Sequence, residues 1–182
     1  MDHKNQKRIT LKNIKYMASL SRETHCYTAD IYFDGVKCGT TGNDGHGGCD
    51  DYQPLACGER VNGKRRPVRQ KCWDAMMNFV ASFDSTTSTL GGLAAISLQP
   101  DLEWVCSDLI NEWLALKELK KFTSKRVIYT IKGKPGIYQT KTIDAVTRER
   151  WAAEIGRRET TDQVLNAMPI PDALALFQER TA

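Results

Sequence analysis

The sequence predicts an α+β fold, in which an antiparallel β-meander and a second β-hairpin pack with a long central helix and shorter helices. Strand-like segments cluster in hairpins rather than alternating with helices, and one long segment with helical periodicity separates the two hairpin regions. The chain has 182 residues, of which 41% are hydrophobic, and this is enough to form a core. We expect one domain over residues 1–182.

The N-terminal meander is predicted from alternating apolar positions. Residues 9–20 mix apolar and polar side chains in a way that suits a strand, and residues 27–33 alternate more regularly. The apolar members of that alternation are Tyr27, Ala29, Ile31 and Phe33. Asp34-Gly35 is a strong signal for a two-residue hairpin turn, so we expect residues 36–41 to return beside 27–33.

A glycine-rich segment follows, with four glycines between residues 42 and 48. Glycines at this density indicate a shaped loop rather than a strand, because they adopt backbone angles that other residues avoid. Backbone amides of such a loop can approach a phosphate, but neither the Walker pattern nor the dinucleotide-binding pattern is present. We therefore favour a turn that the fold requires. The polar side chains that we keep as site candidates are Asn43, Asp44, His46 and Asp51.

Two helices are predicted in the middle of the chain. Residues 68–83 place apolar side chains three or four positions apart along one stripe, and residues 100–122 do so over a longer stretch. Pro100 suits the first helical position and Asp101 the first turn. The Ser/Thr-rich segment 84–99 between the helices is the best candidate for a mobile loop or a lobe boundary.

The second hairpin is predicted from a β-branched run at residues 127–131 and a partner at 136–142. A glycine- and lysine-rich turn joins these two segments. The sequence leaves open whether both hairpins share one sheet.

Three short helices complete the prediction. Thr147 would cap the first, with Trp151 facing inward, and Thr161 would cap the second. The last would begin near Pro171. The four tryptophans all fall in predicted helices, where we interpret them as core residues rather than base-stacking platforms.

Composition favours a soluble, cytoplasmic protein. No run of about 18 apolar residues is present, and the basic N-terminus lacks the apolar segment of a signal peptide. We expect His3 to lie in a frayed tail. In a reducing compartment the six cysteines are expected to be thiols rather than disulfides.

Basic residues are concentrated in segments, although the net charge is only +4 and the isoelectric point about 8.7. The connector between residues 60 and 71 carries six basic side chains and no acid. They are Arg60, Lys64, Arg65, Arg66, Arg69 and Lys71. A second run follows the long helix, where Lys120, Lys121 and Lys125 are the candidates. Such runs are candidate phosphate-contacting surfaces, and plain solubility is the alternative explanation.

Metal binding and thiol chemistry are further possibilities. Cys49 lies three positions after His46, and two further cysteines downstream would complete a four-ligand zinc set. The zinc candidates are His46, Cys49, Cys57 and Cys72. Aspartates of the glycine-rich segment could hold magnesium, although aspartates in such loops more often hydrogen-bond the turn itself. A cysteine nucleophile would pair Cys49 or Cys26 with a histidine, but no family-type sequence surrounds either cysteine. We expect no cofactor, with zinc or magnesium as the alternatives.

Residues 23–35, running into Asn43-Asp44-Gly45-His46-Gly47-Gly48-Cys49, resemble a group of small, largely uncharacterised proteins encoded by phages and other mobile elements. The long helix, its lysine-rich end and the sequence Val-Ile-Tyr-Thr-Ile-Lys-Gly-Lys-Pro-Gly are similar to them as well. Small proteins of this kind include inhibitors of host defence, among them anti-CRISPR proteins directed at Cas9. The resemblance implies that possibility and transfers no functional residue.

The leading hypothesis is therefore a non-enzymatic binding protein that contacts nucleic acid, or a host protein within a nucleoprotein complex, through the two basic segments. Tyr32, on the other strand face from Tyr27, could stack a base beside the lysines. The alternative is a small metal-dependent enzyme that acts on nucleic acid or phosphate esters through the glycine-rich loop. A zinc-stapled interaction module is the third possibility.

Overall fold

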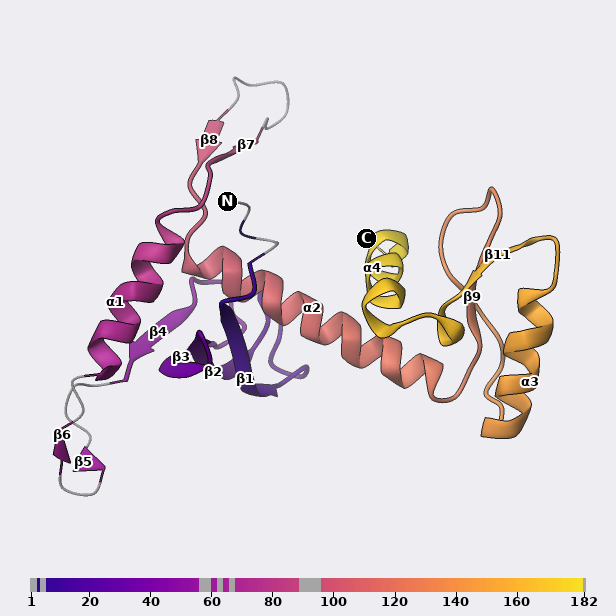
Figure 1. The fold of residues 1–182 in the computed structure, drawn as a ribbon, viewed down its shortest axis with the longest axis horizontal. Helices are drawn as coiled ribbons and strands as arrows, with labels where there is room; N and C mark the ends of the chain where they lie inside the picture. Colours follow the sequence, from indigo (N-terminus) through magenta and orange to yellow (C-terminus); the bar gives the residue numbers. More distant parts are fainter. Residues whose placement is uncertain are drawn as a thin grey trace. The chain divides into compact units, whose positions relative to one another are not determined.

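The computed structural model describes residues 3, 6–55, 60–61, 64–65, 68–88 and 96–181, and side chains for residues 3, 6–55, 70–86 and 97–181. These residues confirm the α+β fold, with helices and two separate antiparallel sheets of four and three strands (Figure 1). The chain divides into two compact units, unit 1 over Met1–Ile110 and unit 2 over Asn111–Ala182. The boundary between the units lies inside the long helix, whereas segment 84–99, the candidate lobe boundary, lies within unit 1.

Unit 1 is built on a sheet with the order β1-β2-β3-β4. Its strands are β1 (Ile9–Tyr16), β2 (Tyr27–Phe33), β3 (Val36–Asn43) and β4 (Asp51–Pro54). The predicted turn is confirmed, since Asp34 and Gly35 have φ of 47° and 79°, the left-handed angles that a two-residue hairpin requires. Strand β4 was not predicted, because its four residues, Asp-Tyr-Gln-Pro, are too few to show apolar alternation.

Strand β3 runs two residues further than expected, so Gly42 belongs to the sheet and not to the loop. A Cβ atom at Gly42 would lie 2.9 Å from the carbonyl oxygen of Tyr27 on β2. Glycine therefore permits the close approach of two backbones here.

The core of unit 1 lies between one face of this sheet and two helices, α1 (Val68–Val80) and the first half of α2 (Leu102–Thr123). The alternation in β2 buries Ile31 and Phe33 on this face, where they meet Met76 and Val80 of α1 and Val105 of α2. Helix α2 starts two residues later than predicted. Asp101 acts as its N-cap, because Asp101 Oδ1 accepts a hydrogen bond of 3.1 Å from the amide of Trp104.

A disulfide between Cys38 on β3 and Cys72 on α1 joins the sheet to the helix, and the expectation that all six cysteines are thiols is wrong for this pair. The two residues are 34 positions apart, so their proximity follows from packing and not from local sequence. Reduced, denatured protein should titrate six thiols, and unreduced, denatured protein no more than four, because Cys38 and Cys72 are paired. Ellman's reagent measures both numbers, and six thiols in the unreduced sample would contradict the pairing.

The prediction that His3 lies in a frayed tail is also wrong, because its side chain is buried. Its Nε2 lies 3.3 Å from Asp108 Oδ2, and its ring packs edge-on against Phe83 and Trp104. Two short ribbons complete unit 1, with β5 (Arg60–Val61) paired to β6 (Lys64–Arg65) and β7 (Thr86–Ser88) paired to β8 (Ile96–Leu98).

Unit 2 is built on a three-stranded sheet with the order β10-β9-β11. Its strands are β9 (Ile128–Ile131), β10 (Tyr138–Gln139) and β11 (Thr161–Val164). The second hairpin is confirmed by the pairing of β9 with β10, and it does not share a sheet with the first. The prediction of a helix that starts at Thr161 is wrong, because residues 161–164 form β11. A 3-10 helix, η2 (Leu165–Ala167), then follows it.

Helices cover both faces of this small sheet (Figure 1). Ile128 faces α4 (Ile170–Thr181) and the second half of α2, whereas Val127 and Val164 pack against Ile155 of α3 (Ala145–Gly156). Two details of α3 differ from the prediction, because its N-cap is Asp144 and not Thr147, and because Trp151 is exposed. Within the described residues, no helix carries an apolar stretch long enough to cross a membrane.

Candidate functional site

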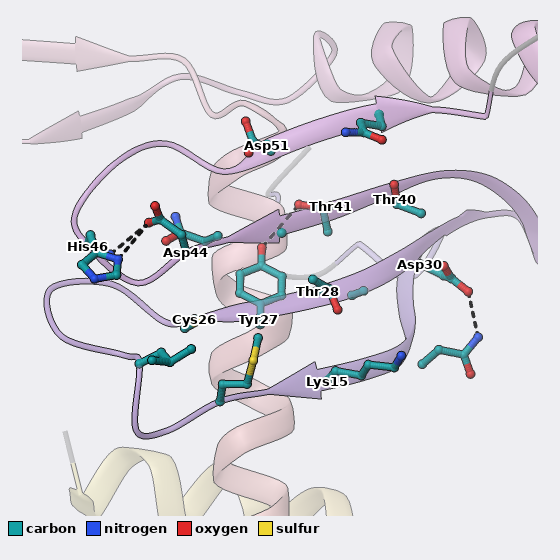
Figure 2. Close-up of a pocket in the computed structure, with 17 residues that line it drawn as sticks. Lys15, Cys26, Tyr27, Thr28, Asp30, Thr40, Thr41, Asp44, His46 and Asp51 are labelled. Atoms are coloured by element: carbon teal, nitrogen blue, oxygen red, sulfur yellow. Dashed lines mark hydrogen bonds and ion pairs between the residues drawn. The ribbon is translucent and has the colours of Figure 1, made fainter.

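The face of the unit 1 sheet that points away from the helices is polar and hollowed. Strand alternation places side chains there in rows that cross all four strands. From β1 to β4, the first row contains Lys12, Asp30, Thr40 and Gln53. The second row contains Lys15, Thr28, Gly42 and Asp51. A hollow of about 1040 Å³ lies over these rows, and Figure 2 shows Lys15 and Asp51 on its two opposite edges.

One cation–carboxylate network lies in the first row. Lys37 Nζ is 2.8 Å from Asp30 Oδ1, and Asn13 Nδ2 donates to Asp30 Oδ2 at 2.7 Å. Partial burial alone would raise the pKa of Asp30, but the hydrogen bonds from Lys37 and Asn13 outweigh it, so the pKa is lowered. Beside this network, Lys12 Nζ lies 4.4 Å from the ring centroid of Tyr32. The charge of Lys37 is therefore compensated, and the Tyr32 ring is covered by a lysine.

The loop between β3 and β4 is held by the side chain of Asn43. Its Oδ1 accepts from Thr24 Oγ1 at 2.6 Å and from the Gly45 amide at 2.9 Å. Its Nδ2 donates to the Gly48 carbonyl at 2.9 Å and to Asp50 Oδ1 at 3.0 Å. Asn43 therefore fixes the loop from within, and its amide is fully engaged.

Two glycines let this loop pack on residues 17–26. Gly45 and Gly47 have φ of 86° and 80°, in the left-handed region that favours glycine. A Cβ atom would overlap the Leu20 carbonyl oxygen at Gly45 and the Glu23 carboxylate at Gly47. These contacts give Gly45 and Gly47 a structural reason that is independent of any ligand.

The aspartates of the loop have different roles. Asp50 accepts a hydrogen bond of 2.5 Å from the hydroxyl of buried Tyr27, and a longer one from Tyr52. Burial, followed by this hydrogen bond, raises the pKa of Tyr27. Asp44 is exposed, with Oδ1 at 3.7 Å from His46 Nδ1 (Figure 2). Asp51 is exposed at the rim of the hollow. The structure therefore brings Asn43, Asp44, His46 and Asp51 to one end of the hollow.

The zinc candidates do not converge in the described part of the chain. Cys72 is bonded to Cys38, Cys57 lies outside the described residues, and no three His, Cys, Asp or Glu among the described residues gather at a metal-binding distance. Cys49 is exposed, and the charge of Glu103 and a hydrogen bond to it raise the pKa of the thiol. A raised pKa disfavours the thiolate that nucleophilic or metal-binding chemistry requires.

The basic connector is described only in part. Its backbone forms β5, β6 and the start of α1, but the side chains of Arg60, Lys64, Arg65 and Arg69 and all of Arg66 lie outside the described residues. Lys71, on α1, is exposed.

The lysine-rich end of α2 gains two further cations from folding. Arg148 on α3 donates a hydrogen bond to the Ser124 carbonyl. The segment that contains Lys141 lies beside residues 125–127, because the Ile143 amide donates a hydrogen bond of 2.9 Å to the Lys125 carbonyl. Arg126 donates to Gln139 at 2.6 Å. We call this group the basic end of unit 2. Its members are Lys120, Lys121, Lys125, Arg126, Lys141 and Arg148.

Within the described part of the chain, the charges of the basic end are not compensated by ion pairs. Among the described residues, none of its six cations lies within 4.0 Å of a carboxylate oxygen. The side chain of Asn166 holds the backbone near these cations. Its Oδ1 accepts a hydrogen bond of 2.7 Å from the Ile128 amide, and its Nδ2 donates to the carbonyls of Thr123 and Arg126 at 3.1 and 2.9 Å. The sequence reasoning missed Lys141 and Arg148, because they lie outside the basic run and approach it only through β10 and α3.

Comparison of the chain with protein families, with curated proteins and with solved structures found no match. The candidate sites therefore rest on their own geometry.

Proposed function

We propose that this chain is a non-enzymatic binding protein that contacts nucleic acid, alone or within a nucleoprotein complex of the host, through the basic end of unit 2. The observation that carries the proposal is the set of six cations at the end of α2, with no ion-paired carboxylate among the described residues. Such a surface attracts phosphates and releases their counterions when it binds.

The distribution of charge between the two units supports the same interpretation. Unit 2 has thirteen basic and nine acidic residues, a net charge of +4, whereas residues 1–110 have thirteen of each. The whole net charge of the chain therefore belongs to the unit that carries the basic end. The alternative explanation is that the cations stabilise the α2 C-terminus, where the helix dipole favours positive charge.

On the resemblance described above, we extend the proposal to a phage-encoded inhibitor of host defence, of the anti-CRISPR type directed at Cas9. An inhibitor of that kind would use charge to accelerate encounter with its nucleoprotein target, and a few buried anchors to fix specificity.

Salt dependence of binding tests the proposal. Fluorescence anisotropy with labelled duplex DNA, single-stranded DNA and RNA should show binding that weakens at least tenfold between about 50 and 200 mM salt, if three or more phosphates are contacted. Absence of binding to all three, or a salt-insensitive affinity, would overturn direct nucleic-acid contact. A pull-down from host lysate with and without nuclease then separates a protein partner from a nucleic-acid one.

The metal-dependent enzyme remains a prediction from the sequence, and no contact in the described residues favours it. Asn43 and Asp50 are engaged in holding the loop, and Asp44 and His46 are exposed without a third ligand among the described residues. Incubation of RNA and DNA with the protein and Mg²⁺ or Mn²⁺, with Asp44→Ala and His46→Ala as variants, tests that alternative directly.

A further inference from the structure

We propose that the hollowed face of the unit 1 sheet binds an extended polar segment of a partner protein, with an acidic side chain over Lys15 and a basic side chain against Asp51. The site is separate from the basic end of unit 2, and it recognises a different chemistry. Three features of the hollow carry this assignment, namely the charges at its two edges, its floor and its rim.

The charges of this face form a dipole and not a cationic surface. The three lysines on the face are Lys12, Lys15 and Lys37. Lys37 is neutralised by Asp30, and Lys12 lies on the ring of Tyr32. Lys15 on β1 and Asp51 on β4 are both exposed and, among the described residues, neither forms an ion pair. With Asp44 beyond Asp51, the formal charges of the face cancel, so a polyanion such as single-stranded RNA would meet repulsion at the β4 edge.

The floor between these charges offers hydrogen bonds without strong charge. Thr28 and Thr40 contribute hydroxyls and Gln53 an amide, and Gly42 lacks a side chain and leaves the second row open. The hydroxyls and amides of these side chains both donate and accept, which suits the alternating N–H and C=O groups of an extended peptide backbone. The Tyr32 ring on this face already has Lys12 Nζ over it, so it is a poorer stacking surface for a base or a sugar.

The rim adds two exposed apolar side chains next to the Lys15 edge. Met17 and Leu20 both line the hollow, with relative exposures of 39% and 45%. Exposed apolar side chains that border a polar hollow can contact an apolar side chain of a bound partner, and methionine adapts to irregular partners. We therefore expect an apolar side chain beside the acidic one in the bound segment.

The width of the sheet sets the spacing of the bound charges. Lys15 and Asp51 stand on the first and fourth strands, which lie about 14 Å apart at the usual strand spacing. An extended chain covers this distance in about four residues. The bound segment should therefore carry its acidic and basic side chains about four positions apart.

Selection from a random dodecapeptide library on the immobilised full chain tests the proposal. Enriched peptides should share an acidic and a basic residue about four positions apart. Labelled copies should bind Lys15→Glu and Asp51→Lys at least tenfold more weakly than the unchanged chain. A peptide with its two charges exchanged should bind the double variant Lys15→Glu/Asp51→Lys better than either single variant. Both residues are exposed, so each variant should remain folded, and circular dichroism checks this.

The control variant is Lys132→Glu, an exposed cation of unit 2 that should leave peptide binding unchanged. Peptide binding that persists when the basic end of unit 2 is neutralised separates this site from the proposed function. The proposal would be overturned if no peptide were enriched, or if the enriched peptides lacked the charge pair. It would also be overturned if the peptides bound Lys15→Glu as tightly as they bind the unchanged chain. Decauridylate binding that Lys15→Glu abolishes would assign the face to nucleic acid instead.

Discussion

Neutralising three lysines of the basic end should reduce nucleic-acid affinity roughly 100- to 1,000-fold at about 0.1 M salt. The variant is Lys120→Gln/Lys121→Gln/Lys125→Gln. Each phosphate contact contributes about 0.9 to the slope of log affinity against log salt, so three lost contacts lower that slope by about 2.7. Glutamine keeps the helix propensity of lysine without placing a negative charge at a helix C-terminus, so the fold should be retained.

A matched control removes the same charge from the other end of unit 2. Lys132 and Lys134 follow β9 at the end remote from α2, and Arg157 follows the end of α3. The variant Lys132→Gln/Lys134→Gln/Arg157→Gln should lose affinity only weakly, through the change in net charge. Equal losses in both triple variants would show that total charge matters and that the basic end is no specific site. Anisotropy over a salt series measures both slopes.

The parts of the fold that sequence reasoning predicted are those with a strong local signal. Strand β2 was predicted with its observed bounds, because four alternating apolar residues precede an Asp-Gly turn. Strand β4 and strand β11 were missed for one shared reason. Both are short and mostly polar, and each is an edge strand that exists because a neighbouring strand pairs with it. Pairing across the chain leaves no periodicity in either segment itself.

The candidate sites divide in the same way. Lys120, Lys121 and Lys125 were found because they lie in one run of sequence, whereas Arg148 joins them through a hydrogen bond to Ser124. The hollow of unit 1 was not predicted, since its rows depend on the registers of three strand pairs, including one with the unpredicted β4. Side chains that point away from a core are visible in a sequence, but their neighbours across strands are not.

Replacing Asn43 with alanine should destabilise unit 1 by about 2–3 kcal/mol, because four hydrogen bonds are lost in a partly buried loop. Two of the lost partners belong to the loop that Gly45 and Gly47 shape, and a third is the carboxylate that holds the hydroxyl of Tyr27. Urea unfolding followed by tryptophan fluorescence measures the change in unfolding free energy. The control is Asp44→Ala in the same loop, whose side chain is 81% exposed and which should cost less than about 1 kcal/mol.

Asn43→Asp distinguishes the donor half of the amide from the acceptor half. The aspartate keeps the acceptor for Thr24 and Gly45, but it loses both donated bonds and faces the carboxylate of Asp50 where a 3.0 Å hydrogen bond had been. Two carboxylates at that separation repel each other, so the variant should be least stable at neutral pH. Its deficit relative to the unchanged chain should shrink as the pH falls toward about 4, because protonation of either carboxyl removes the repulsion. A deficit that is independent of pH would mean that Asn43 and Asp50 do not meet in the folded loop, and would contradict the role of Asn43 in holding that loop.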